Sequence, residues 1–358
     1  MLSPTEAVRE LPSYHPPLAG RDGLRLDFNE NTVGCSPRVL ERLRQLGPEQ
    51  LARYPEREPL EAGVADILGV AAPELLLTNG VDEAIHLLCE TYLGPGDEAL
   101  IVVPTYSMYR IYMMATGAQV INVAAGKDFG FPADELCKRI TPRTRLIAIA
   151  NPNNPTGTVA PLEELLRVVR SARAAAVLVD EAYFEFYGQS VLPGRREFPN
   201  LFLARTFSKA YGLAGLRIGV LIGDVDQMRA VRGVSSPYNV NAVALACLPE
   251  ALRDQAYIQQ YVREICESRA RLESALKAGG IESWPSRANF VLARVGAAPS
   301  FVEQMRRRGI LVRDRSGDHG CEGCVRITVG PRGHADRLLN ALQETFEELG
   351  IAQGATRR

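Results

Sequence analysis

Short apolar runs alternate with amphipathic segments through the middle of the chain. The runs predict strands at 74–78, 98–103, 119–123, 146–150, 177–179 and 201–206. Between them, apolar residues recur at helical spacing and predict helices that start at Gly80 or cover 106–116, 134–139 and 162–172. Strands that alternate with helices of this length indicate a mostly parallel sheet with helices on both faces. The sequence therefore predicts an α/β fold.

The two ends of the chain have a different pattern. The segment 26–31 is extended, and Ser36 and Pro37 are a cap and first-turn pair that opens a helix through about residue 46. From Asn241 onward the pattern is helical, and strand candidates follow at 288–295, 310–313 and 325–329, with helices at 256–278, 299–308 and 334–349. We expect an N-terminal arm (1–48), a large domain (49–240) and a smaller C-terminal α/β domain (241–358).

Composition narrows the classes of partner. The chain has 358 residues, 46% of them hydrophobic, which is enough for a large core and more than one domain. The net charge is −1 with both signs mixed along the chain, so we expect neither a nucleic-acid partner nor an anionic membrane surface. The first residues do not resemble a signal peptide, and no apolar run approaches about 18 residues, so we expect a cytoplasmic protein.

Cysteine spacing offers one motif. The seven cysteines are scattered and odd in number, which favours reduced thiols over a disulfide framework. Only Cys321 and Cys324 have motif spacing, with His319 beside them. Because no second CxxC or HxxxH motif supplies the remaining ligands, we expect a loop before a strand here and no metal site.

The segment 205–219 carries the first candidate chemistry. Lys209 lies where the strand at 201–206 gives way to a loop. Its amine can form an imine with an aldehyde, while Thr206, Ser208 and Arg217 supply donors for a phosphate. An aldehyde and a phosphate together indicate pyridoxal phosphate. A lysine in a polar loop is by itself more often a solvated surface charge, so this interpretation requires partners elsewhere.

Candidate partners follow other predicted strands. Ligands of doubly wound sheets collect at the carboxyl ends of the strands. Asp180 ends one strand and could pair with the pyridine nitrogen, and Tyr183 and Asn154 could reach the ring oxygen. Asp180 could instead be a helix N-cap.

Two further candidates concern the phosphate and the ring face. Val81 and Asp82 follow Gly80 at a helix start, where backbone N–H groups and the helix dipole favour a phosphate. Tyr106 follows another strand and could stack on the ring, although an aromatic at such a position is more often part of the core.

Taken together, these motifs resemble fold-type I pyridoxal-phosphate enzymes of the histidinol-phosphate aminotransferase family. The matching segments occur in family order and span nearly the whole chain: 29–31, 53–55, 79–83, 104–106, 151–157, 180–183, 205–209, 215–217, 289–290, 310–313 and 326–330. The elements at 151–157 and 208–209 are shared by many aminotransferases, whereas 326–330 preceded by 311–314 is narrower. The resemblance implies a large domain with a mostly parallel seven-stranded sheet.

The resemblance also implies roles for individual residues. Lys209 would form an imine with the cofactor and move the substrate proton, Asp180 would hold the pyridinium, and Tyr183 would contact the ring oxygen. The remaining cofactor contacts would come from Asn154, Tyr106, Ser208, Thr206, Arg217, Val81 and Asp82, and Tyr54 would reach in from the other subunit of a homodimer. Arg313, Arg326 and Asn29 would bind the substrate.

The substrate itself is less well specified. The implied reaction is amino transfer from histidinol phosphate to 2-oxoglutarate; the alternatives are an aromatic amino-acid aminotransferase or a threonine-phosphate decarboxylase. The sequence departs from the family at Val33, where members usually carry a tyrosine that helps bind the substrate phosphate. Tyr14 or Tyr238 could fill that role instead.

Overall fold

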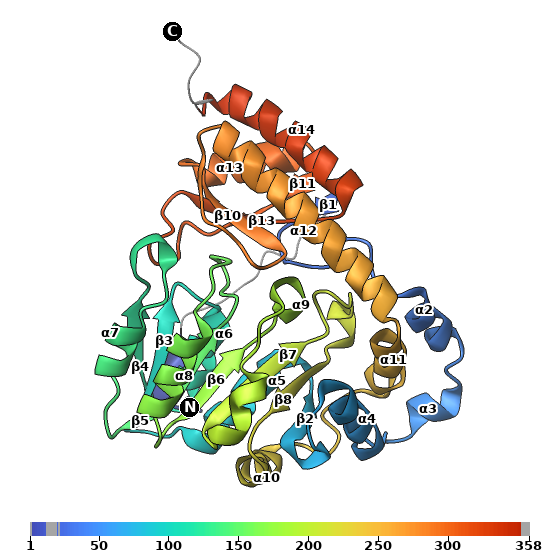
Figure 1. The fold of residues 1–358 in the computed structure, drawn as a ribbon, viewed down its shortest axis with the longest axis vertical. Helices are drawn as coiled ribbons and strands as arrows, with labels where there is room; N and C mark the ends of the chain where they lie inside the picture. The colour runs from blue at the N-terminus through green and yellow to red at the C-terminus, as the bar shows by residue number, and fades with distance from the viewer. Residues whose placement is uncertain (1, 12–19, 21, 352–358) are drawn as a thin grey trace.

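The computed structural model describes residues 2–11, 20 and 22–351, which form two packed units (Figure 1). The lower unit in Figure 1 is built on a seven-stranded sheet of order β2-β8-β7-β6-β5-β3-β4. Its strands are β2 (Leu75–Thr78), β3 (Glu98–Val103), β4 (Gln119–Ala124), β5 (Thr144–Ala150), β6 (Ala176–Asp180), β7 (Leu201–Thr206) and β8 (Gly219–Ile222). Neighbouring strands are parallel except where β8 pairs with β2 and β7. The predicted α/β class with a mostly parallel seven-stranded sheet is confirmed.

Both faces of this sheet are buried. Val177 and Val179 of β6 belong to one apolar cluster, while Leu178 between them belongs to another. The first cluster includes side chains of α4 (Glu58–Leu68), α7 (Ala133–Lys138) and α8 (Leu162–Ser171), and the second those of α5 (Gly80–Tyr92), α6 (Ser107–Ala115) and α10 (Val225–Val234). A strand covered on both faces needs apolar residues at successive positions, which explains the continuous apolar runs in the sequence.

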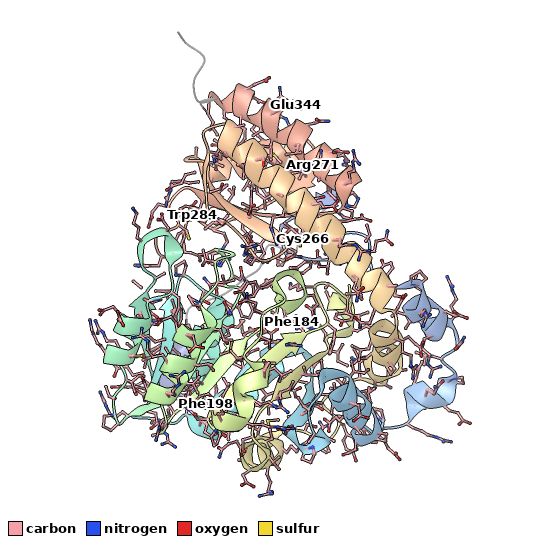
Figure 2. The ribbon with its side chains drawn as sticks, in the orientation of Figure 1. Phe184, Phe198, Cys266, Arg271, Trp284 and Glu344 are labelled. Carbon is pink, nitrogen blue, oxygen red and sulfur yellow. The ribbon has the colours of Figure 1, made fainter. Side chains whose placement is uncertain are left out.

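The upper unit contains a four-stranded antiparallel sheet of order β12-β13-β10-β9 (Figure 1). Its strands are β12 (Arg313–Asp314), β13 (Cys324–Thr328), β10 (Phe290–Arg294) and β9 (Glu282–Ser283). The helices α12 (Gln255–Ala278) and α13 (Ala298–Arg307) pack on the sheet, and α14 (Arg332–Leu349) packs on both helices. Arg271 of α12, labelled in Figure 2, pairs with Asp336 of α14 at 2.6 Å.

Alternation along this small sheet decides where its arginines lie. Val325 and Ile327 of β13 belong to the buried cluster that also contains helix residues such as Leu338 of α14. Arg326 lies between them in the strand and therefore on the opposite face. Arg313 of β12 is directly paired with Arg326, so both arginines lie on the face away from the helices.

Some predicted elements have different limits in the structure. The strand expected at 310–313 is two strands, because β11 (Ile310–Leu311) pairs with β1 (Leu24–Arg25) of the arm, whereas β12 pairs with β13. The long helical stretch is two helices, α11 (Ala242–Arg253) and α12, which meet at Asp254. The remaining helices are α1 (Glu6–Arg9), α2 (Pro37–Arg44), α3 (Pro48–Ala52) and α9 (Phe184–Tyr187), with short 3₁₀ turns at 72–74, 127–129, 192–197 and 214–216.

The two units meet through specific side chains. The Sγ atom of Cys266 on α12 lies 3.9 Å from the carbonyl oxygen of Phe186 on α9. Figure 2 labels Cys266 on α12 and Phe184 on α9. Phe129 of the large unit packs edge-on against Trp284 of the small unit, with 4.7 Å between ring centroids. These contacts join the two units at two separate places.

The Cys321–Cys324 motif lies in a buried apolar cluster of the small unit. Cys321 and Cys324 are buried free thiols that form no disulfide. The described part of the chain holds no group of three or more His, Cys, Asp and Glu residues arranged for a metal ion. Across the same residues, none of the helices combines the length and the apolar character that crossing a bilayer requires.

Candidate active site

A cleft of about 620 Å³ lies between the large sheet and the small sheet. It is formed by loops at the carboxyl ends of β3, β5, β6 and β7, by the start of α5, and by the arginine-bearing face of the small sheet. Doubly wound sheets bind ligands at this edge because loops from several strands converge there. The predicted residues that line the cleft are Asn29, Val81, Asp82, Tyr106, Asn154, Asp180, Tyr183, Thr206, Ser208, Lys209, Arg217, Arg313 and Arg326.

Lys209 lies directly after β7, three residues beyond Thr206. Its Nζ atom donates a hydrogen bond to the carbonyl oxygen of Phe28 in the arm, 3.1 Å away. Burial, and then the positive charge of Arg326, lower the pKa of Lys209 to about 8. A substantial fraction of the amine is therefore neutral and nucleophilic near physiological pH.

Asp180 is the last residue of β6 and is 5% exposed. Its carboxylate accepts a hydrogen bond from the Tyr109 hydroxyl at 2.6 Å and another from the backbone N–H of Ala182 at 3.0 Å. Burial raises the pKa of Asp180 to about 6, although these hydrogen bonds act to lower it. A cation placed against this carboxylate would relieve the cost of its burial.

Sequence reasoning missed Tyr109. Its side chain is fully buried, and its ring packs edge-on against Tyr106 with 5.7 Å between centroids. The available signal was its position, since Tyr109 follows Tyr106 by three residues and so lies on the same face of α6. The helix N-cap interpretation of Asp180 is partly right: its carboxylate caps the turn at Ala182, but α9 begins later, at Phe184.

A network of polar side chains surrounds the first turn of α5. Asp82 accepts a hydrogen bond from the Tyr106 hydroxyl at 2.8 Å and forms an ion pair with Arg217 at 2.9 Å. Arg217 has a left-handed backbone with φ of 52°, and its guanidinium packs so closely on Gly80 that a Cβ there would lie 2.9 Å from it. Nearby, the Thr206 hydroxyl donates to that of Ser208 at 2.9 Å. The arrangement presents hydroxyls, a guanidinium and a helix N-terminus to one end of the cleft.

Tyr183 and Asn154 lie where the two units meet. The Tyr183 hydroxyl accepts a hydrogen bond from Asn29 Nδ2 at 2.8 Å. The Oδ1 atom of Asn154 accepts a hydrogen bond from Arg326 Nη1 at 2.6 Å. This bond fixes the orientation of the Asn154 amide and leaves its Nδ2 group as the donor. Arg326 also donates to the carbonyl oxygen of Asp27 at 2.6 Å, so the arm, the large sheet and the small sheet are connected through this one side chain.

The opposite end of the cleft is strongly cationic. Arg313, Arg315 and Arg326 all line it, and burial together with the charge of Arg315 lowers the pKa of Arg326 to about 10. Arg313 lies over the ring of Phe28, and Arg326 over that of Phe290. Sequence reasoning identified Arg313 and Arg326 but missed Arg315, two positions along the chain from Arg313.

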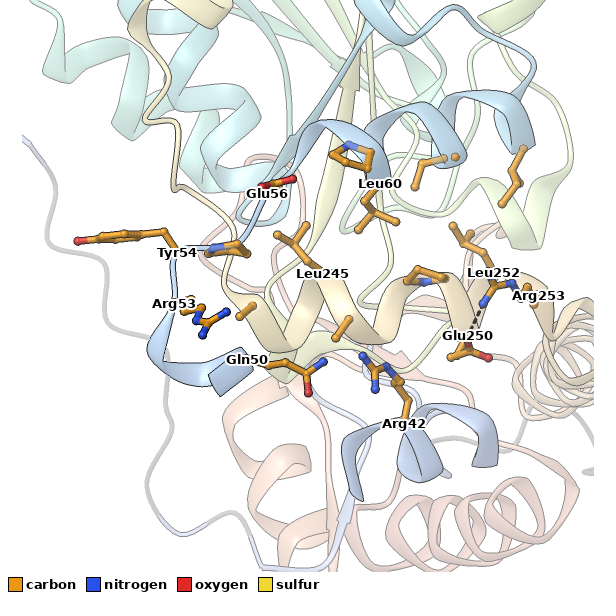
Figure 3. A pocket seen from close by; sticks show the side chains of 18 of the residues that line it. Arg42, Gln50, Arg53, Tyr54, Glu56, Leu60, Leu245, Glu250, Leu252 and Arg253 are labelled. Carbon is orange, nitrogen blue, oxygen red and sulfur yellow. Dashed lines mark hydrogen bonds and ion pairs between the residues drawn. The ribbon is translucent and has the colours of Figure 1, made fainter. Parts of the chain in front are cut away.

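Tyr54 does not line this cleft. It lies beside a separate hollow of about 790 Å³ formed by residues of α2, α3, α4 and α11, and its ring points away from that hollow (Figure 3). The ring is 77% exposed and stacks on Tyr238, with 4.3 Å between centroids. Tyr238 therefore does not take the place of the missing arm tyrosine within this chain. Val33 is 53% exposed and also lies outside the cleft lining, while Tyr14 falls outside the described residues.

Comparison with known proteins agrees with this geometry. The sequence pattern of the family "Aminotransferase class I and II" matches residues 21–343. A histidinol-phosphate aminotransferase of Paracoccus denitrificans is 35% identical, with 97% of each chain covered, and one of Roseobacter denitrificans is 38% identical, with 89% of this chain and 90% of the relative covered. The structure of the Sinorhizobium meliloti histidinol-phosphate aminotransferase, in complex with pyridoxal-5'-phosphate, superposes with a TM-score of 0.88 at 26% identity, covering 96% of this chain and 98% of that one.

Proposed function

Because the chain belongs to the aminotransferase class I and II family and is a pyridoxal-phosphate-dependent aminotransferase, we propose that it transfers the amino group of histidinol phosphate to 2-oxoglutarate. The observation that carries this proposal is the cleft itself. It combines a half-buried amine at Lys209, a buried carboxylate at Asp180 and a cationic end on the small sheet. The names of the relatives support the choice of histidinol phosphate as the amino donor.

The residues at the large-sheet end fit pyridoxal phosphate. Asp180 is a buried acid whose burial is costly unless a cation lies against it, and a protonated pyridine nitrogen is such a cation. Arg217, Ser208 and the N–H groups at the start of α5 would hold the phosphate, and the missing Cβ of Gly80 lets the Arg217 guanidinium approach the first turn of α5. When bound, pyridoxal phosphate supplies an aldehyde that bonds to amines and a ring that withdraws electrons.

The remaining steps belong to side chains of this chain. Lys209 would bond to the cofactor aldehyde with loss of water. Once the substrate amine has displaced it, its free Nζ atom would carry the substrate proton, because its lowered pKa lets the amine both accept and release a proton near pH 8. Tyr183 and Asn154 would hydrogen-bond the ring oxygen, with Asn29 fixing the Tyr183 hydroxyl from the arm. Arg313 and Arg326 would bind the anionic end of the substrate.

A half-reaction screen tests the substrate. The enzyme loaded with pyridoxal phosphate is mixed with one amine at a time, and the loss of the absorbance of the bound cofactor is followed. We expect histidinol phosphate to react with a higher kcat/KM than phenylalanine or tyrosine. A preference for the aromatic amino acids would favour an aromatic aminotransferase, and release of carbon dioxide from threonine phosphate would favour the decarboxylase.

The exposed position of Tyr54 supports a homodimer. Tyr54 and the hollow beside it (Figure 3) share no lining residue with the cleft of their own chain, so Tyr54 is available to reach the cleft of a second copy. Mixing inactive Lys209→Ala subunits with inactive Tyr54→Ala subunits should restore activity, since a mixed dimer then has one intact site. Mixed dimers that stay inactive would rule out a shared site.

The location and the domain limits are also proposals. We place the enzyme in the cytoplasm, in keeping with a biosynthetic reaction on soluble metabolites. The limits 1–48, 49–240 and 241–358 follow the change of sequence pattern at Asn241, and limited proteolysis should cut near them if they are correct.

A further inference from the structure

Arg315 lies on the same face of the small sheet as Arg313 and Arg326. Its backbone N–H donates to the carbonyl oxygen of Cys324 at 2.9 Å, which continues the ladder between β12 and β13 by one step. Side chains two residues apart in a strand point to the same face, so Arg315 follows Arg313 onto the arginine-bearing face. Its side chain is 10% exposed and lines the cleft.

Each of the three arginines has a nitrogen that donates no hydrogen bond to any other described residue. These atoms are Nη1 of Arg313, Nε of Arg315 and Nε of Arg326, all buried and without a hydrogen-bond partner. Buried N–H donors are normally paired, and an unpaired donor costs about 1 to 3 kcal/mol. Three such donors around one cleft indicate a bound anion with several acceptor oxygens.

The charges at this end indicate how much negative charge the anion carries. Arg315 forms an ion pair with Asp318, which offsets one of the three guanidinium charges and holds the Arg315 side chain in place. Among these three arginines, two guanidinium charges remain after that pair is counted. A single carboxylate would leave part of this excess uncompensated, whereas a phosphate monoester carries close to two negative charges and three acceptor oxygens.

We propose that Arg315 is a third anion-binding residue that selects substrates carrying a phosphate monoester over otherwise identical amines without one. This inference rests on the proposed function, because it assigns the substrate phosphate to the same cleft. It adds to that function a residue whose role is discrimination between substrates. A guanidinium fits the role better than an ammonium would, because its planar fork can bond Asp318 through one edge and the phosphate through another.

The test compares histidinol phosphate with histidinol, which is the same amine without the phosphate. We expect the loaded wild-type enzyme to prefer histidinol phosphate in kcat/KM. Arg315→Gln should reduce that preference about 10- to 100-fold, mainly through a higher KM for histidinol phosphate, with histidinol changed little. Arg315→Lys should recover part of the preference, because it restores the charge without the planar fork.

Arg308→Gln is a matched control. Arg308 is also an ion-paired arginine of the small unit, 19% exposed and bonded to Glu344 and Glu348, but it lies outside the cleft lining. We expect it to leave the preference unchanged. If Arg315→Gln fails to fold, Arg315→Lys carries the measurement.

The outcomes separate the two proposals. A wild-type enzyme that does not distinguish the two amines would overturn both the proposed substrate and the role of Arg315. A wild-type preference that survives in Arg315→Gln and Arg315→Lys would overturn the role of Arg315 alone. Equal losses on both amines, with unchanged melting temperature, would also overturn it, because they would show a general effect on the cleft.

Discussion

The two ends of the cleft handle charge in opposite ways. At the large-sheet end, Arg217 is paired with Asp82, and Tyr106 completes the network, so the polar groups are held in place before any ligand binds. At the small-sheet end, Arg313 and Arg326 keep buried donors that have no hydrogen-bond partner among the described residues. A paired network is rigid and suits a group that stays bound, while unpaired donors suit a group that arrives and leaves. This difference is in keeping with the proposed roles, in which the large-sheet end holds the cofactor and the small-sheet end binds the substrate.

Lys209 and Asp180, the reacting groups in the proposed function, both line the cleft and share one property. Asp180 is buried and Lys209 is half-buried, and desolvation shifts the pKa of each toward the neutral form, to about 8 for Lys209 and about 6 for Asp180. Without a ligand, desolvation of these two charged groups lowers the stability of the folded protein. Such shifted pKa values are common in sites arranged for catalysis. If the two ends act independently of Lys209 and Asp180, substitutions at these two residues should change the rate far more than the binding of either ligand.

The largest effect should come from Lys209→Ala. It removes the central amine but touches neither end, so we expect turnover to fall by at least about 10³-fold while pyridoxal phosphate and substrate still bind. Steady-state kinetics and equilibrium dialysis measure the two quantities separately. Lys138→Ala, at an exposed lysine of α7, is the control and should leave both unchanged. Loss of cofactor binding in Lys209→Ala would show that the large-sheet end does not hold the cofactor on its own.

Asp180→Asn should lower kcat by about 10²- to 10³-fold, because a neutral amide no longer stabilises a charged ring nitrogen. Cofactor affinity should change much less, since the network around Asp82 is untouched. A similar loss in affinity and in rate would contradict the division of the cleft into two ends.

The same substitution should stabilise the cofactor-free protein at alkaline pH. The folded pKa of Asp180 is raised above the unfolded value, so between 3.8 and about 6 the folded state binds more protons and stability falls as pH rises. Above that window the buried charge costs up to about 3 kcal/mol, which Asn removes. The melting temperature of Asp180→Asn should exceed that of the wild type at pH 8, and the difference should vanish near pH 4.

Tyr109→Phe should have an intermediate effect. It removes the 2.6 Å hydrogen bond to Asp180, which costs about 1.5 to 3 kcal/mol of stability for a donor to a charged group. We expect kcat to fall about 10-fold, because the carboxylate is less firmly held, with KM for the substrate nearly constant. Tyr112→Phe on the same helix is the control, since Tyr112 does not line the cleft. A change in KM alone would place Tyr109 with the substrate end.

Val33→Tyr should have the smallest effect. Val33 is 53% exposed and lies outside the cleft lining, so an added hydroxyl has no direct path to the small-sheet arginines within one chain. We expect kcat/KM for histidinol phosphate and for phenylalanine to change less than about twofold. A selective gain of tenfold or more for histidinol phosphate would show that the arm reaches the anion after all, and would sharpen the assignment of the substrate end.

The sequence determined the candidate groups that lie at strand ends. Lys209 and Asp180 could be identified because each follows a strand whose apolar run is continuous, and the carboxyl ends of parallel strands share one edge. Asp82 could be identified because a glycine before a helix is a local signal. In each case the evidence lies within a few residues of the side chain concerned.

Only the tertiary structure decided which side chains these groups meet. Tyr109 reaches Asp180 because α6 packs against the face of the sheet that contains Leu178, and Arg315 reaches the cleft because β12 pairs with β13 in the register that sets Arg313 opposite Arg326. A helix pattern does not specify which strand its face will cover, and a two-residue strand has too little pattern to specify its partner. These contacts depend on packing between segments far apart in sequence, and so they follow from the folded chain and from no local motif.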